Sequence, residues 1–225
     1  ENVDSRIWPR TAAIAERFWS HNSVTDVKDM YRRLDRISLQ LEELGLLHEK
    51  NYEMMLRRLV GGEDVKPLKM LVDVLEPVKE YKRHSMGVKY TQYSPYTRVV
   101  DAARPDAATA RKFNELVSVL IESRDGSVTS LLLGQLAFWK TGMPELKDQI
   151  KRHPILFEVM PHVESLELIC ELMPEMVGSV FSGDKVDQAI IDKAKAFLKG
   201  NTIRHGQAEL TIVEGFEKLV KFCAP

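Results

Sequence analysis

The chain opens with Glu1-Asn-Val-Asp-Ser-Arg-Ile-Trp-Pro-Arg-Thr-Ala-Ala-Ile-Ala-Glu-Arg-Phe-Trp-Ser20, the stretch on which the interpretation of the fold depends. Trp8 and Trp19 are eleven residues apart, which is close to three helical turns, so on one helix they would share a face. Small or apolar residues fall on or beside that face: Ala12, Ala15 and Phe18. Pro9 costs little only in a first helical turn, so it predicts where the helix begins. The pattern predicts a tightly packed amphipathic helix.

The same residues resemble a known family. Asn2-Val-Asp-Ser-Arg-Ile-Trp-Pro-Arg10, followed by Ala13-Ile-Ala-Glu-Arg-Phe-Trp-Ser20, is similar to the end of the catalytic barrel in bacterial family 20 glycoside hydrolases, the β-N-acetylhexosaminidases. In that family such a stretch forms the last helix of a (β/α)8 barrel and comes shortly after the final active-site motif, Trp-x-Glu. The resemblance is close over residues 1–20 and looser up to Leu59, and the rest of the chain matches no motif.

The resemblance implies an enzyme that removes terminal N-acetylglucosamine or N-acetylgalactosamine from glycoconjugates by substrate-assisted hydrolysis. In the family, the Glu of an Asp-Glu pair protonates the leaving oxygen, and the Asp orients the substrate's own acetamido group for attack. This chain has no adjacent Asp-Glu pair and no Trp-x-Glu, and Glu63-Asp64 has the reverse order. We therefore expect the non-catalytic C-terminal portion of such an enzyme, without catalytic, cofactor-binding or metal-binding residues and inactive by itself.

The composition is that of an ordinary globular protein. The chain has 225 residues, of which 44% are hydrophobic and 29% charged, and a net charge of −1, so no general basic field suits nucleic acid or an anionic membrane. Its longest apolar runs are too short to span a bilayer. Cys170 and Cys223 lie far apart in predicted helices, and we expect free thiols rather than a disulfide. The start at Glu without an initiator Met is consistent with an excised segment or a processed product, and the resemblance suggests a periplasmic or extracellular location.

Helical periodicity runs through most of the remaining chain. Apolar residues at steps of three and four from Val27 to Leu44 predict a long helix that Gly45 ends. Gly61-Gly-Glu-Asp64 is the clearest break. We expect residues 1–60 to hold the last barrel helix with its packing helices, and residues 61–225 to form a C-terminal helical domain. The predicted fold class is all-α, a multi-helical array or bundle.

The helices after Pro105 are predicted in pieces. Residues 127–139 form the most apolar helix, which we expect to be central. Gly142 and Pro144 are expected to end it and to begin another helix over 145–153, and Pro174 is expected to break a later helix in the same way. The last helix is predicted over 207–222, and no segment is assigned to a β-strand.

One stretch, residues 87–96, has an extended character and carries Tyr90, Tyr93 and Tyr96. The functional interpretation is a strip on which sugars stack, because tyrosine faces and the nearby Lys89 or Arg98 suit carbohydrate. The alternative is a linker across the domain surface with half-buried tyrosines. We favour the linker, because no carboxylate lies close in sequence to orient a sugar.

The titratable residues form no recognisable site. The histidines are scattered, and none has metal-ligand spacing: His21, His48, His84, His153, His162 and His205. Glu164, Glu167 and Glu171 share a helix face near His162, and we interpret them as a solvated acidic stripe. Arg10 and Glu16 are expected to form ion pairs that hold the opening helix in place. Asn201 heads no glycosylation sequon, because Ile203 stands in the third position.

The opening helix also predicts a partner. If it belongs to a barrel, the face with Trp8 and Trp19 would lose the sheet it covers when separated from it. The natural partner is the catalytic barrel of the same parent chain, and the chain alone should form a homodimer or pack the helix on its own helical domain. Two rival interpretations stay open: a free-standing helical interaction module without enzymatic activity, and a carbohydrate-binding module based on the tyrosines.

Overall fold

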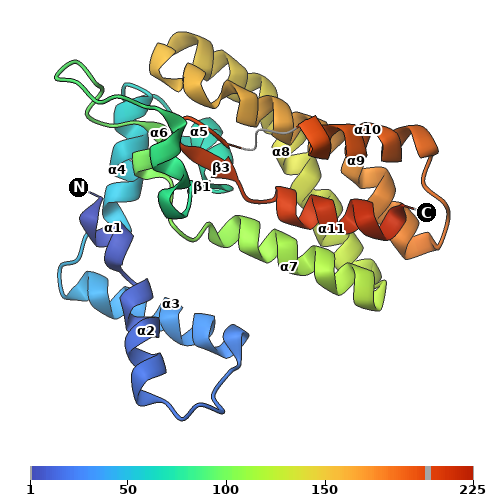
Figure 1. Cartoon of the computed structure of the whole chain (residues 1–225), viewed down its shortest axis with the longest axis horizontal. Helices are drawn as coiled ribbons and strands as arrows, with labels where there is room; N and C mark the ends of the chain where they lie inside the picture. Colours follow the sequence, from blue (N-terminus) through green and yellow to red (C-terminus); the bar gives the residue numbers. More distant parts are fainter. Residues whose placement is uncertain (1, 201–203, 225) are drawn as a thin grey trace.

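The computed structural model describes residues 2–200 and 204–224, so Asn201 lies outside the described residues. Most of its regular structure is α-helical, which confirms the predicted fold class (Figure 1). The elements are α1 (Val3–Ile7), α2 (Arg10–Trp19), α3 (Val27–Glu43), α4 (Lys50–Leu59), α5 (Lys66–Val72), β1 (Leu75–Pro77), the 3-10 helix η1 (Glu80–Met86), α6 (Val99–Ala102), α7 (Ala108–Ser123), α8 (Gly126–Arg152), the 3-10 helix η2 (Pro154–Val159), α9 (Met160–Ser182), α10 (Gln188–Gly200), β2 (Arg204–His205), β3 (Ala208–Leu210) and α11 (Val213–Cys223).

The core is built around the two longest helices, α8 and α9, which pack along each other. α7 and α11 lie against this pair. Trp139 of α8 is 1% exposed, and its ring lies 4.9 Å from that of Phe113 on α7, measured between centroids. The prediction that the most apolar helix is central is therefore confirmed.

The predicted breaks inside the long helices are wrong. α8 continues through Gly142 and Pro144, and α9 continues through Pro174. A proline inside a helix removes one hydrogen bond, but Met143 and Leu146 beside it are fully buried and hold α8 against the core. Gly142 serves packing instead of termination, because a Cβ there would lie 2.5 Å from the sulfur of Met70.

A small antiparallel sheet was not predicted. Its strand order is β1-β3-β2, with Leu75 opposite Leu210 and Pro77 opposite Ala208. Gly206 and Gln207 have positive φ values of 55° and 64° and form the turn between β2 and β3. The last helix consequently begins at Val213 rather than at residue 207. Strands of two or three residues are too short to show the alternating pattern by which strands are recognised.

The opening helices differ from the prediction in one respect. α2 begins directly after Pro9, as expected, but the short helix α1 precedes it, and Trp8 lies between the two helices in an extended conformation. The prediction that Trp8 and Trp19 share one helix face is therefore wrong. α2 packs on α3, and Arg33 of α3 donates to Glu16 of α2 at 2.5 and 3.0 Å.

The pair α2 and α3 projects from the rest of the molecule at the lower left of Figure 1. α3 touches α7 through Lys28, whose ammonium lies 2.5 Å from Glu115, and through Tyr31, whose ring lies 3.4 Å from the Arg111 guanidinium. Within the single chain α2 packs on α3 instead of on the helical domain, and the predicted homodimer stays a prediction.

α4 belongs to the same core as the later helices. Tyr52, Met55, Leu56 and Leu59 are buried in the hydrophobic cluster with residues of α5 to α11. The hydrophobic core thus contains residues from both sides of residue 61, where we expect the domain boundary. That boundary stays a prediction. Among the described residues, no helix has the length and apolar character needed to cross a membrane.

Candidate functional site

The tyrosine segment, residues 87–98, runs over the surface between η1 and α6. Tyr90 is 60% exposed, Tyr93 86% and Tyr96 82%. The prediction of a linker with half-buried tyrosines, which we favoured from the sequence, is therefore wrong about the burial of these side chains. Tyrosines that lie open to water are free to contact a ligand.

A groove of about 780 Å³ lies beside this segment. We call it the tyrosine groove; its lining includes Arg83, His84, Tyr90, Tyr96, Asp101 and Gln207. Gln207 is only 2% exposed, and its Oε1 accepts hydrogen bonds from Arg83 Nε at 2.5 Å and from the Tyr90 hydroxyl at 2.7 Å. The floor of the groove is thus polar, and its rim is aromatic.

The tyrosine segment is anchored to the body at its C-terminal end. Arg98 forms an ion pair with Glu158 of η2, and both side chains are largely buried. Arg58 of α4 donates to the hydroxyl of Thr97 at 2.7 Å, and its guanidinium lies 5.6 Å from the Tyr96 ring centroid. These contacts hold Tyr96 at the groove without covering its exposed face.

α1 adjoins the wall of the groove. The Arg6 guanidinium donates to the carbonyl oxygens of Val100 at 2.7 Å and Ala103 at 2.9 Å, and Asn2 donates to Asp101 at 3.4 Å. Burial, followed by the positive charge of Arg83, lowers the pKa of Arg6. The first residues of the chain are therefore joined to the α6 segment, of which Asp101 also lines the groove.

A second candidate surface is the outer face of α2. Phe18 is 83% exposed and Trp19 91% exposed, and Ile14 is also exposed. We call these three residues the α2 face. Exposed apolar side chains gathered on one helix are typical of a surface that contacts another molecule or domain.

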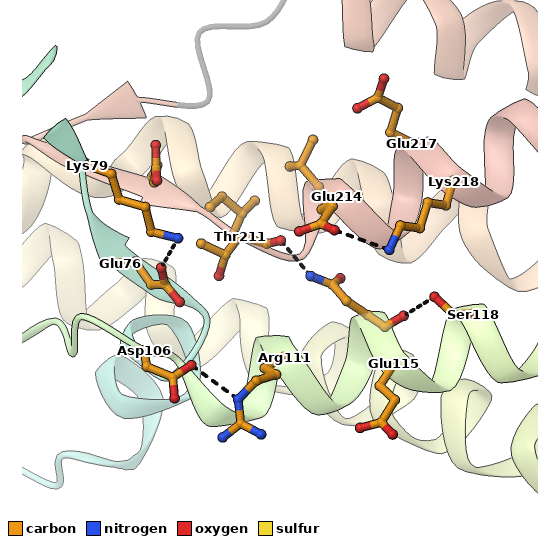
Figure 2. Close-up of a pocket in the computed structure, with 14 residues that line it drawn as sticks. Glu76, Lys79, Asp106, Arg111, Glu115, Ser118, Thr211, Glu214, Glu217 and Lys218 are labelled. Atoms are coloured by element: carbon orange, nitrogen blue, oxygen red, sulfur yellow. Dashed lines mark hydrogen bonds and ion pairs between the residues drawn. The ribbon is translucent and has the colours of Figure 1, made fainter. Parts of the chain in front are cut away.

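A third hollow of about 530 Å³ lies between α7, α11, β1 and β3 (Figure 2). Several of its charged side chains pair with one another, as Glu76 does with Lys79 and Glu214 with Lys218. Asn114 links α7 to α11, because its amide donates to Thr211 O at 3.0 Å and accepts from Gly215 N at 3.0 Å. We interpret this hollow as a helix–helix joint rather than as a binding site.

Several other residues singled out in the sequence have structural partners. Glu167 accepts from Lys147 and Glu171 from Lys193, both at 2.7 Å or less, in agreement with a solvated stripe. Arg10 donates to the carbonyl of Arg6 at 2.5 Å. In the part of the chain that the structure describes, no three His, Cys, Asp or Glu side chains are grouped to hold a metal ion.

Burial disfavours the charged forms of three titratable side chains, His162, Cys170 and Cys223. Burial lowers the pKa of His162 to about 4, and its Nε2 lies 3.0 Å from the carbonyl of His205. Cys170 and Cys223 are free thiols, as predicted, and burial raises their pKa to about 12 and about 11. A thiol with such a pKa is a poor nucleophile at neutral pH.

Sequence reasoning identified the tyrosines but missed the polar floor of their groove. Gln207 follows the tyrosine segment by more than a hundred residues, and it reaches the groove because β3, which begins directly after it, pairs with β1. Its sequence neighbourhood carries no motif. The one sequence signal for the turn is Gly206, because glycine favours the positive φ that Gly206 and Gln207 both adopt.

No protein-family model matches the chain. A search of solved structures finds a family 20 chitobiase of Flavobacterium johnsoniae, with 31% identity and a TM-score of 0.80 over 97% of this chain. The chain is related to the family 20 glycoside hydrolases. The resemblance noted in its opening residues is thereby confirmed. Counterparts of both the opening helices, α1–α3, and the remaining elements from α4 to α11, which we call the helical body, occur in one family 20 chain.

Curated relatives share shorter segments. The β-hexosaminidase subunit beta of Homo sapiens is 39% identical over 51 residues, and that of Sus scrofa is 52% identical over 48 residues. These matches cover 23% and 21% of this chain. The chain spans 33% of the length of the chitobiase, and each of the two matches spans 9% of the hexosaminidase subunit.

Proposed function

We propose that this chain is the C-terminal, non-catalytic portion of a β-N-acetylhexosaminidase that removes terminal N-acetylhexosamines from glycoconjugates by substrate-assisted hydrolysis. In this proposal α1 to α3 complete the catalytic barrel, and the helical body supports it or carries an oligomer contact. The family resemblance supports a periplasmic or extracellular location.

The observation that carries the proposal is the likeness to the chitobiase over nearly the whole chain. A similarity limited to the opening residues would leave the helical body unexplained. The 97% coverage instead pairs the opening helices and the body with a single solved enzyme that is about three times as long. The remaining length of such an enzyme is where a catalytic barrel with its Asp-Glu pair would lie.

The α2 face supports the same proposal. In a (β/α)8 barrel the helices form an outer ring that covers the strands. The open positions of Phe18 and Trp19 are what a barrel helix shows when its strands are missing. Full burial of one such aromatic side chain is worth about 1.5–3 kcal/mol, so the face favours a covering surface.

The test is hydrolysis of 4-nitrophenyl N-acetyl-β-glucosaminide by the full-length protein and by residues 1–225 alone. We expect turnover by the full-length protein and none by this chain above a mock preparation. Activity of this chain alone would contradict its non-catalytic role. An inactive full-length protein without an Asp-Glu pair in a barrel would favour the free-standing helical module.

A further inference from the structure

The tyrosine groove holds binding chemistry that the fold does not need. Three tyrosines within seven residues present their rings to water, although burial of aromatic area is favourable. Other positions of the same segment are polar, such as Lys89 and Ser94. The segment as a whole is therefore not apolar, and a requirement for an apolar segment does not explain the tyrosines. The Arg58 guanidinium lies over the ring of Tyr96 at the rim, and Tyr96 as a whole is still 82% exposed.

The floor of the groove presents a hydrogen-bond donor. Gln207 is 98% buried, and both hydrogen bonds found for its side chain use the carbonyl oxygen. These bonds fix the orientation of the amide, and its Nε2 donates to no group among the described residues. An amide nitrogen in this situation can donate to a ligand or to water in the groove.

The volume, the charge and the shape of the groove limit the class of ligand that it can bind. A volume of about 780 Å³ is in the range of pockets for small molecules rather than of protein interfaces. The lining mixes Arg83 and His84 with Glu80 and Asp101, so it does not select a strongly charged ligand. An aromatic rim over a donor floor suits a pyranose, whose C–H face stacks on a ring and whose acetamido oxygen accepts from an amide.

The position of the groove indicates which sugars it holds. Asp101 both lines the groove and accepts a hydrogen bond from Asn2. On the proposed function, the residues immediately before α1 come from the loop that follows the last barrel strand. Active sites of (β/α)8 barrels lie on the face that these loops form, so the tyrosine groove adjoins that face.

We infer that the tyrosine groove binds the N-acetylhexosamine residues that follow the terminal sugar of an oligosaccharide substrate, with Tyr96 as the stacking platform and Gln207 as the donor. This inference rests on the proposed function. The groove contributes no catalytic residue. It selects chains of linked hexosamines over substrates with a small leaving group.

The test compares Tyr96→Ala with Tyr93→Ala in the full-length protein. Tyr93 is the matched control, because it lies on the same segment and is as exposed but does not line the groove. Loss of one stacking contact is worth about 0.5–1.5 kcal/mol, so we expect KM for the N-acetylglucosamine tetramer to rise up to about tenfold in Tyr96→Ala. KM for 4-nitrophenyl N-acetyl-β-glucosaminide should stay unchanged, and Tyr93→Ala should match the wild type on both substrates.

Equal behaviour of the two variants on the tetramer would overturn the inference, as would an equal loss on both substrates. Calorimetric binding of the tetramer to the same proteins separates this failure from failure of the proposed function. If the full-length protein hydrolyses neither substrate, the proposed function fails. The sugar-binding groove then stands only if the tetramer binds to the wild type and binds more weakly to Tyr96→Ala than to Tyr93→Ala.

Discussion

The opening helices α1–α3 and the helical body α4–α11 use large apolar side chains in opposite ways. In the body, Trp139 is 1% exposed and packs on Phe113. In the opening helices, Trp19 is 91% exposed, and α1 and α2 contain no buried residue. α3 contributes a single one, Leu34.

The difference teaches that the two regions bury their apolar side chains within this chain to different degrees. The body encloses its own hydrophobic core, so the apolar residues of its sequence are buried by other residues of the same chain. The opening helices are amphipathic in sequence, but Ile14, Phe18 and Trp19 are not covered within this chain. A region of this kind is best understood as one half of an interface.

The largest contrast should come from the two tryptophans. Trp139→Ala leaves a cavity in the core, and we expect it to lower the free energy of unfolding by about 3–5 kcal/mol. Trp19→Ala in the same 225-residue chain should change it by less than about 0.5 kcal/mol, because the side chain is exposed. Urea denaturation of both variants measures this, and equal losses would mean that Trp19 is packed in the isolated chain.

Two ion pairs between Arg and Glu give the next contrast. Glu158→Gln leaves the largely buried Arg98 without its charge partner, which we expect to cost about 3 kcal/mol. Glu16→Gln removes the corresponding partner of Arg33 between α2 and α3, where solvent screens the pair, and should leave the midpoint of urea denaturation nearly unchanged. A similar shift in both variants would contradict the distinction between the regions.

Acid should act on the body through His162. Because burial lowers its folded pKa to about 4 from 6.5, the unfolded state binds more protons between these values, and stability falls as pH decreases. We expect about 2 kcal/mol of this loss between pH 6.5 and 4.5. His162→Gln should flatten this part of the profile, whereas His21→Gln, at an exposed site before α3, should reproduce the wild-type slope.

Periodicity predicted the helices well where one face is buried and another exposed. It failed at Pro144 and Pro174, because local preference was outweighed by burial of neighbours such as Met143 and Met173. It failed at β3, because the pairing of β3 with β1 joins segments more than a hundred residues apart, and at β2, because this strand has two residues and pairs only with β3. The tyrosines of the groove were visible in the sequence, but Gln207 was not, because only this pairing carries it to them.

The central claim is that the α2 face is covered in the full-length protein. Hydroxyl-radical footprinting with mass spectrometry tests it on the unmodified protein, with buried Trp139 and exposed Phe138 of α8 as internal standards. The account predicts that Phe18 and Trp19 are protected like Trp139 in the full-length protein and oxidised like Phe138 in the 225-residue chain. Oxidation of Trp19 in the full-length protein at the rate of an open side chain would contradict it.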